Sequence, residues 1–235
     1  MYLFDNIDRK RILLAISLIA IGTLGRISLH DFFNSINNPF TTNGFLDVFF
    51  IIAVISILSG ILLGKYFVFI IPICVIILTD IYYAFIDTIN YALWPSGLFL
   101  FTYSGFVFIA LIGLYTKRKS DINIAFIPKL FGTSVISVIL YDIWTNFGFW
   151  LTYSKLGFYP QNIQGLVTVF LGGIPFMIWH IISFSILLVI VLIPIVLVKD
   201  KLIMMENLNL NYSEKLYLTI ATIFLISISI ITSII

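Results

Sequence analysis

Long apolar runs alternate with short polar segments along the whole chain, and this pattern predicts membrane-spanning helices. A helix that crosses a bilayer needs about 20 consecutive, mostly apolar residues. On this rule the first five predicted helices cover residues 11–29, 45–63, 66–86, 98–115 and 128–151.

The next apolar stretch, Gly165–Val198, is too long for one crossing. Its roughly 34 residues would form a helix of about 50 Å, whereas the hydrocarbon core is about 30 Å thick. Glycines and a proline lie between positions 172 and 175. We therefore predict a break near Gly172–Pro175, a sixth spanning helix at 175–198 and, from the last apolar run, a seventh helix at 215–235.

These runs define an all-α membrane protein. We expect a six-transmembrane-helix bundle over residues 1–198, a polar linker over 199–214 and the C-terminal seventh hydrophobic helix at 215–235. The composition agrees, because 61% of the residues are hydrophobic and only 10% are charged. Soluble domains are about 45–50% apolar and about 25% charged. Soluble, disordered and disulfide-rich secreted classes are thereby excluded.

Basic residues are distributed unevenly among the predicted loops. Loops rich in Lys and Arg stay on the cytoplasmic side of a membrane. The loops on one side carry nearly all the basic residues, and the alternate loops, at about 30–44, 87–97 and 152–164, contain only Lys155. We expect a multi-pass protein of the cell membrane with its N-terminus and linker in the cytoplasm. The net charge of +2 includes no clustered basic face, so we expect no nucleic-acid partner.

Polar side chains within the predicted helices gather toward their outer ends. Charged groups at membrane depth usually line water or pair with one another. The pattern therefore predicts an outward-facing polar site, covered by the long Asn-rich loop at 30–44. The candidate solute-binding residues are Arg26, His30, Asp80, Tyr103, Asp142, Asn146, Trp150 and His180.

The charged candidates also have structural interpretations. Arg26 could pair with Asp80 or Asp142 and lock the packing of the helices. Asp47 lies close enough to the predicted interface to be simply solvated. His30 fits a loop or interface histidine, and a bond to a backbone carbonyl would satisfy His180.

The remaining candidates have equally plain alternatives. Trp150 fits the belt of aromatic residues found at membrane interfaces. Asn146 could bond a neighbouring helix as readily as a solute. The position of these two residues relative to the charged ones therefore decides their role.

No familiar catalytic or cofactor motif is present. The sequence lacks HExxH, GxSxG and GxxxxGK[ST] patterns. It has one cysteine, Cys74, and no CxxCH, so neither a disulfide nor attached haem is expected. We expect no metal, no cofactor and no enzymatic activity. An intramembrane enzyme that uses His180 or Asp142 is a weaker alternative.

The segment Tyr141–Phe176 carries a more distinctive pattern: DIWTNFGFWL at 142–151, YP at 159–160, GL at 165–166 and IPF at 174–176. It resembles a family of uncharacterised prokaryotic membrane proteins with TNFGxWL, YP, GL and IPF at similar spacing. A looser similarity, through Arg26, His30 and Asp80, extends the match to about residues 20–197.

That family is in turn similar to the substrate-binding S components of energy-coupling-factor transporters. The resemblance implies a six-helix protein with both ends of its core in the cytoplasm. It also implies a vitamin or metal-related solute bound from outside, beneath the first outer loop. A separate transmembrane and ATPase module is the partner implied for coupling.

Two functions therefore stay open. In the first, the chain is a membrane solute-binding or transport protein for a small molecule with donor groups or positive charge. Four side chains would anchor the solute and two would pack against it: Arg26, Asp80, Asp142 and Asn146, then Trp150 and Tyr103. In the second, the chain is an accessory subunit that contacts other membrane subunits. A wet pocket lined by these residues favours the first function, and a dry, fully paired cluster favours the second.

Overall fold

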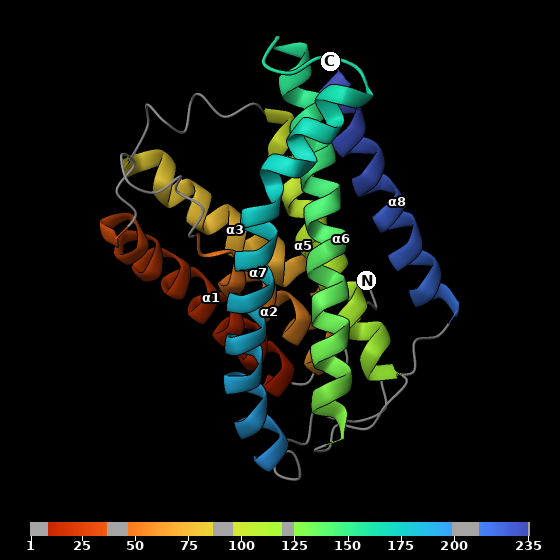
Figure 1. Ribbon diagram of the computed structural model, residues 1–235. Coiled ribbons are helices and arrows are strands. Elements are labelled where there is room, and N and C mark those ends of the chain that lie inside the picture. Colours follow the sequence, from red (N-terminus) through yellow and green to blue (C-terminus); the bar gives the residue numbers. More distant parts are fainter. Residues whose placement is uncertain (1–8, 37–46, 87–95, 119–124, 199–211, 235) are drawn as a thin grey trace.

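The computed structural model describes residues 9–36, 47–86, 96–118, 125–198 and 212–234, and within them all regular structure is helical (Figure 1). The all-α fold is therefore confirmed. The helices are α1 (Arg9–Ile36), α2 (Phe49–Leu58), the π-helix η1 (Ser59–Leu63), α3 (Phe67–Ile86), α5 (Ser96–Arg118), α6 (Phe126–Lys155), α7 (Ile163–Val198) and α8 (Tyr212–Ile234).

Five helices in the described part of the chain are long and apolar enough to cross a membrane. They correspond to the first, third, fourth, fifth and sixth predicted spans, so a multi-pass membrane protein is supported. The apolar helix Phe49–Leu63 is shorter. At 1.5 Å per residue it is about 22 Å long, against about 30 Å for a hydrocarbon core. The second predicted span, 45–63, therefore overestimates this helix.

The short helix lies at the centre of the bundle. Every residue from Val48 to Gly64 is buried. α2 packs against α1, α3, α5 and α7, and Figure 1 shows it behind α7 and between α1 and α5. A helix that is hydrophobic on all sides is buried by its neighbours. Because protein surrounds it, its length need not match the thickness of a bilayer.

Two glycines allow the central helix to approach α5 closely. A Cβ atom on Gly60 would lie 2.0 Å from the carbonyl oxygen of Ala110, and one on Gly113 would lie 2.6 Å from that of Ile57. Small residues permit this kind of backbone contact between membrane helices. Gly64, with φ of 63°, then ends η1.

α7 is continuous over 36 residues, so the predicted break near Gly172–Pro175 is wrong. Pro175 removes one backbone hydrogen bond, but membrane helices tolerate proline when neighbouring groups satisfy the backbone. Gly173 has a packing role instead, because a Cβ there would lie 2.5 Å from Nδ2 of Asn146 on α6. A helix longer than the hydrocarbon core extends beyond it or tilts.

Both terminal helices are longer than predicted. α1 continues to Ile36, so His30 and Asp31 are helical and do not belong to a loop. The rest of the predicted outer loop, 37–44, lies outside the described residues. α8 begins at Tyr212, within the predicted linker, whose residues 199–211 also lie outside them. α8 packs against α5 and α6, on the other side of the bundle from α1 (Figure 1).

Candidate functional site

The eight candidate residues do not converge on a single site. Three of them belong to a polar cluster that joins α1, α3 and α5. Two others form a chain of carboxylate and imidazole groups across α2, α6 and α7, next to a groove that Asn146 also lines. Trp150 lies apart, and His30 lies at the edge of the first group. We call the first group the arginine cluster (Arg26, Thr79, Asp80 and Tyr103) and the second the histidine chain (Asp47, His180 and Asp142).

The arginine cluster uses both oxygens of its acid. Nη1 of Arg26 donates to Oγ1 of Thr79 and to Oδ1 of Asp80, the latter at 3.2 Å. The hydroxyl of Tyr103 donates to Oδ2 of Asp80 at 2.5 Å. Of the two acids predicted as partners of Arg26, the structure thus selects Asp80. The cluster connects three helices with few polar atoms left for a solute.

His30 lies at the edge of this cluster. Its ring is 4.4 Å from that of Tyr83, whose hydroxyl donates to the carbonyl oxygen of Arg26 at 3.4 Å. Nδ1 of His30 is 3.5 Å from Oδ1 of Asp31, and both side chains are partly exposed. The structure therefore places His30 beside the arginine cluster but among exposed groups near the end of α1.

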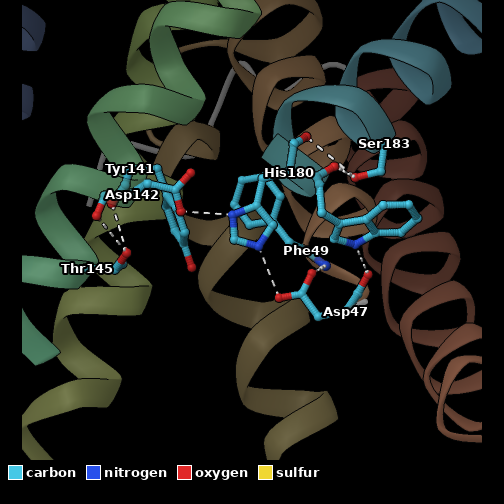
Figure 2. A network of polar contacts seen from close by, with 8 residues as sticks. Asp47, Phe49, Tyr141, Asp142, Thr145, His180 and Ser183 are labelled. Carbon is cyan, nitrogen blue, oxygen red and sulfur yellow. Dashed lines mark hydrogen bonds and ion pairs between the residues drawn. The ribbon is translucent and has the colours of Figure 1, made fainter. Parts of the chain in front are cut away.

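In the histidine chain, one imidazole bridges two carboxylates (Figure 2). Nδ1 of His180 is 2.8 Å from Oδ1 of Asp142, and Nε2 is 3.1 Å from Oδ2 of Asp47. The predicted bond from His180 to a backbone carbonyl is therefore wrong. The His180 and Asp142 side chains are buried, at 7% and 5% exposure, whereas that of Asp47 is 44% exposed.

Asp47 is held by both helices that it joins. Its Oδ1 accepts a hydrogen bond from the backbone N–H of Phe49 at 3.1 Å, and its carbonyl oxygen accepts one from Nε1 of Trp179 at 3.0 Å. The interpretation of Asp47 as merely solvated is therefore wrong. An acid just before a long apolar run often accepts a hydrogen bond from the backbone at the start of the helix, so the sequence position of Asp47 pointed to its contact with Phe49.

Aromatic rings fix the orientation of the imidazole. The ring of Phe49 stacks on that of His180, with centroids 4.0 Å apart, and Tyr141 presents its ring edge-on at 6.2 Å (Figure 2). Phe49 and Tyr141 are themselves buried and in contact. The ring nitrogens are thereby held toward the two acids.

A groove of about 500 Å³ lies between α6 and α7, beside the buried end of the histidine chain. Its walls are mainly apolar and include Ile139, Phe170 and Met177. Asp142 and Asn146 supply the polar side chains of the lining. Oδ2 of Asp142 is buried and has no hydrogen-bond partner in the described part of the protein. One of the residues that line the groove thus has an unused strong acceptor.

Trp150 lies outside both polar groups. Its Nε1 donates to the carbonyl oxygen of Pro160 at 3.1 Å, across the turn between α6 and α7. This bond explains its position without a solute. Asn146, in contrast, lines the groove and packs on Gly173 of α7.

The site offers two chemical capacities. The unpaired oxygen of Asp142 can accept a donor from a molecule in the groove. His180 can take up a proton at one ring nitrogen and release one at the other. Among the described residues, no group of three or more His, Cys, Asp or Glu side chains is arranged to hold a metal ion.

Comparison with known proteins identifies a family but no function. Residues 6–205 match DUF6580, a family of unknown function, and because this match covers most of the sequence the chain belongs to that family. The prediction of an uncharacterised family is confirmed. No curated protein and no solved structure matches the chain. α8 lies beyond the matched region.

Proposed function

We propose that this DUF6580 protein binds a small amphipathic solute in the groove between α6 and α7 and takes part in its transport across the membrane. The observation that carries the proposal is the buried, unpartnered Oδ2 atom of Asp142, a residue that lines that groove. Acids at membrane depth usually mark functional sites. A buried polar atom without a partner costs free energy, and a donor on the solute would remove that cost.

The groove has the size and character of a ligand site. Such sites have volumes of roughly 300–1,000 Å³ and apolar walls with a few placed polar groups. The volume here is about 500 Å³. Asn146, four residues after Asp142 on α6, adds an amide that can donate and accept. We therefore expect a solute with an apolar body and a polar or charged head.

Access to the groove is from the side of the bundle. Ile143, Leu171 and Ile174 line it and are 47%, 61% and 40% exposed. In a bilayer this surface would face acyl chains, so a solute that partitions into lipid would reach the groove directly. This differs from the outward-facing polar site expected from the sequence, because Arg26 and Asp80 are engaged with each other instead.

Transport is the part of the proposal supported by resemblance. The similarity to S components of energy-coupling-factor transporters suggests that binding serves uptake. The sequence has no GxxxxGK[ST] loop, so the energy for transport would have to come from a separate nucleotide-hydrolysing module or from an ion gradient.

The same proposal includes a cell-membrane location with a cytoplasmic N-terminus. Its support is the bias of basic residues toward alternate loops. Two of these basic residues, Lys65 before α3 and Arg11 near the start of α1, both lie near Tyr66. Burial raises the pKa of Tyr66, and the two positive charges act in the opposite direction. Labelling of single cysteines placed at positions 9 and 157 in intact cells would test this orientation.

The solute is best sought by native mass spectrometry of the full chain purified from its host in mild detergent. We expect a bound small molecule that is lost in Asp142→Asn. Asp31→Asn is the matched control, since Asp31 is a 68% exposed acid on α1. A small molecule retained equally in both variants, or absent from the unmodified protein, would contradict the proposal.

The second candidate function is that of an accessory subunit. The fully paired acid of the arginine cluster favours it, because a closed cluster locks helices without binding a solute. In this case the same purification would yield a stoichiometric set of other membrane subunits and no small molecule. The Asp142→Asn variant would then alter assembly or stability only.

A further inference from the structure

We propose that the solute is a monovalent organic cation, and that the groove exchanges it for a proton carried between Asp142 and Asp47 by His180. The inference rests on the proposed function and specifies both the charge of the solute and its coupling ion. It follows from three observations: the bridged imidazole, the unpartnered oxygen of Asp142 and the unequal exposure of the two acids.

The bridged imidazole determines how many protons the empty site must hold. Each ring nitrogen of His180 is within hydrogen-bond distance of a carboxylate oxygen, at 2.8 and 3.1 Å. Each such bond requires one proton between its two heavy atoms. The three groups therefore share at least two protons. With two protons their net charge is −1, whichever atoms carry them.

A net charge within a low-dielectric bundle is costly unless it is compensated. Two ligands can compensate it at the same place. A third proton can neutralise the carboxyl group of Asp142, or a cationic head group in the groove, which Asp142 lines, can pair with that carboxylate. Either one brings the site to neutrality, whereas both together would leave it at +1. Proton and cation should therefore exclude each other.

The unequal exposure of the two acids gives the proton a route. The side chains of Asp142 and His180 are almost fully buried, but that of Asp47 is 44% exposed. The proton already shared by Asp47 and His180 moves onto Nε2 while the proton on Nδ1 passes to Asp142, and the Asp47 carboxylate left behind then takes up a proton from water. The cation then loses its carboxylate partner and leaves. One proton is taken up for each cation released, only N–H and O–H bonds change, and cation return reverses the transfer.

The surroundings of the imidazole support transfer along this line. α7 packs against α6 and α2, and the titratable groups that face His180 from them are Asp142 and Tyr141 of α6 and Asp47 before α2. Phe49 stacks on the ring and holds its nitrogens toward the acids. The guanidinium of Arg26 pairs with Asp80 in the other cluster.

Calorimetry with a defined probe tests the exchange. The full chain in phosphatidylcholine nanodiscs would be titrated with octylammonium, and with 1-octanol as the neutral control. Repeating the titration in two buffers of different protonation enthalpy counts the protons released. We expect about one proton per octylammonium and an affinity that rises up to about tenfold per pH unit, because linked ligands affect each other reciprocally.

Substitutions in the chain test the route separately. His180→Gln and Asp47→Asn should slow proton release, followed with an indicator dye by stopped flow, by about a hundredfold while cation binding persists. Asp31→Asn should release protons at the unmodified rate. If His180→Gln does not fold, Asp47→Asn alone decides, since that side chain is half exposed.

The outcomes separate the two proposals. Octylammonium binding without proton release would overturn the exchange and leave solute binding in place. Proton release at an unchanged rate in both relay variants would overturn the route. Absence of saturable binding that depends on Asp142 would overturn the exchange and the cation-binding form of the proposed function together.

Discussion

The two polar groups of this bundle have similar ingredients but different degrees of closure. Each contains a buried acid beside a basic side chain. In the arginine cluster, Arg26 and Tyr103 occupy both oxygens of Asp80. In the histidine chain, His180 occupies one oxygen of Asp142 and leaves the other unpartnered beside a groove.

The identity of the basic partner deepens this contrast. An arginine stays charged at any ordinary pH, so its ion pair has a single state. A histidine gains and loses protons near neutral pH. The arginine cluster can therefore fasten α1, α3 and α5 but cannot switch, whereas the histidine chain joins α2, α6 and α7 through a group that can change its charge. The fully bonded acid of the arginine cluster therefore indicates a structural role, and the unpartnered oxygen of Asp142 indicates the candidate site.

The largest expected effect comes from breaking the closed cluster. Arg26→Met would leave the carboxylate of Asp80 buried without its cation, and loss of one partner of a buried pair costs about 3–5 kcal/mol. Denaturant titration in detergent would measure the free energy of unfolding. The double variant Arg26→Met/Asp80→Leu should recover most of the loss. A single variant as stable as the unmodified chain would show that the cluster is not a lock.

The hydroxyl of Tyr103 gives the next largest effect. Tyr103→Phe removes one hydrogen bond to the carboxylate of Asp80 and keeps the ring, at a cost of about 1.5–3 kcal/mol, typical of a hydrogen bond to a charged group. The same titration would measure it. Tyr82→Phe is the matched control, because Tyr82 directly precedes Tyr83 on α3 and its hydroxyl makes no hydrogen bond in the described part of the chain. Equal losses in the two variants would contradict the cluster geometry.

Asp142→Asn should lower the free energy of unfolding by about 1 kcal/mol, less than Arg26→Met or Tyr103→Phe, because the amide oxygen can still accept a hydrogen bond from His180. Asp80→Asn is the matched substitution in the closed cluster and should be much more damaging. Comparing the free energies of unfolding of Asp142→Asn and Asp80→Asn therefore tests the difference between the two polar groups directly. If Asp142→Asn proved the more destabilising, the histidine chain would be the structural lock and the proposed site would be wrong.

Sequence pattern predicted the helices better than it predicted their contacts. Spanning helices follow from apolar length alone, so α3 was placed within one residue of its observed start. The break in α7 failed because neither Gly173 nor Pro175 reveals by itself whether a neighbouring helix will support it. The local sequence pattern thus predicts where a helix lies, but it does not show whether packing against neighbouring helices will keep that helix continuous.

The candidate site shows the same limit. Arg26, Asp80, Tyr103, Asp142 and His180 were singled out because polar groups at membrane depth need partners. Their division into two groups depends on which helix faces meet, and the bond from Asp47 to His180 spans 133 positions of sequence. No spacing within one helix contains that information.

Trp150 provides the smallest expected effect and a test of where the site ends. Trp150→Phe removes an N–H bond to Pro160 at a partly solvated position, so the loss should be at most about 0.5–1 kcal/mol. Octylammonium affinity should stay unchanged, because the indole bonds the turn after α6 and is absent from the lining of the groove. Phe170→Ala, which alters the groove wall, should weaken binding in the same titration. A stronger effect from Trp150 than from Phe170 would move the site toward the α6–α7 turn, away from the unpartnered oxygen of Asp142 that distinguishes the two polar groups.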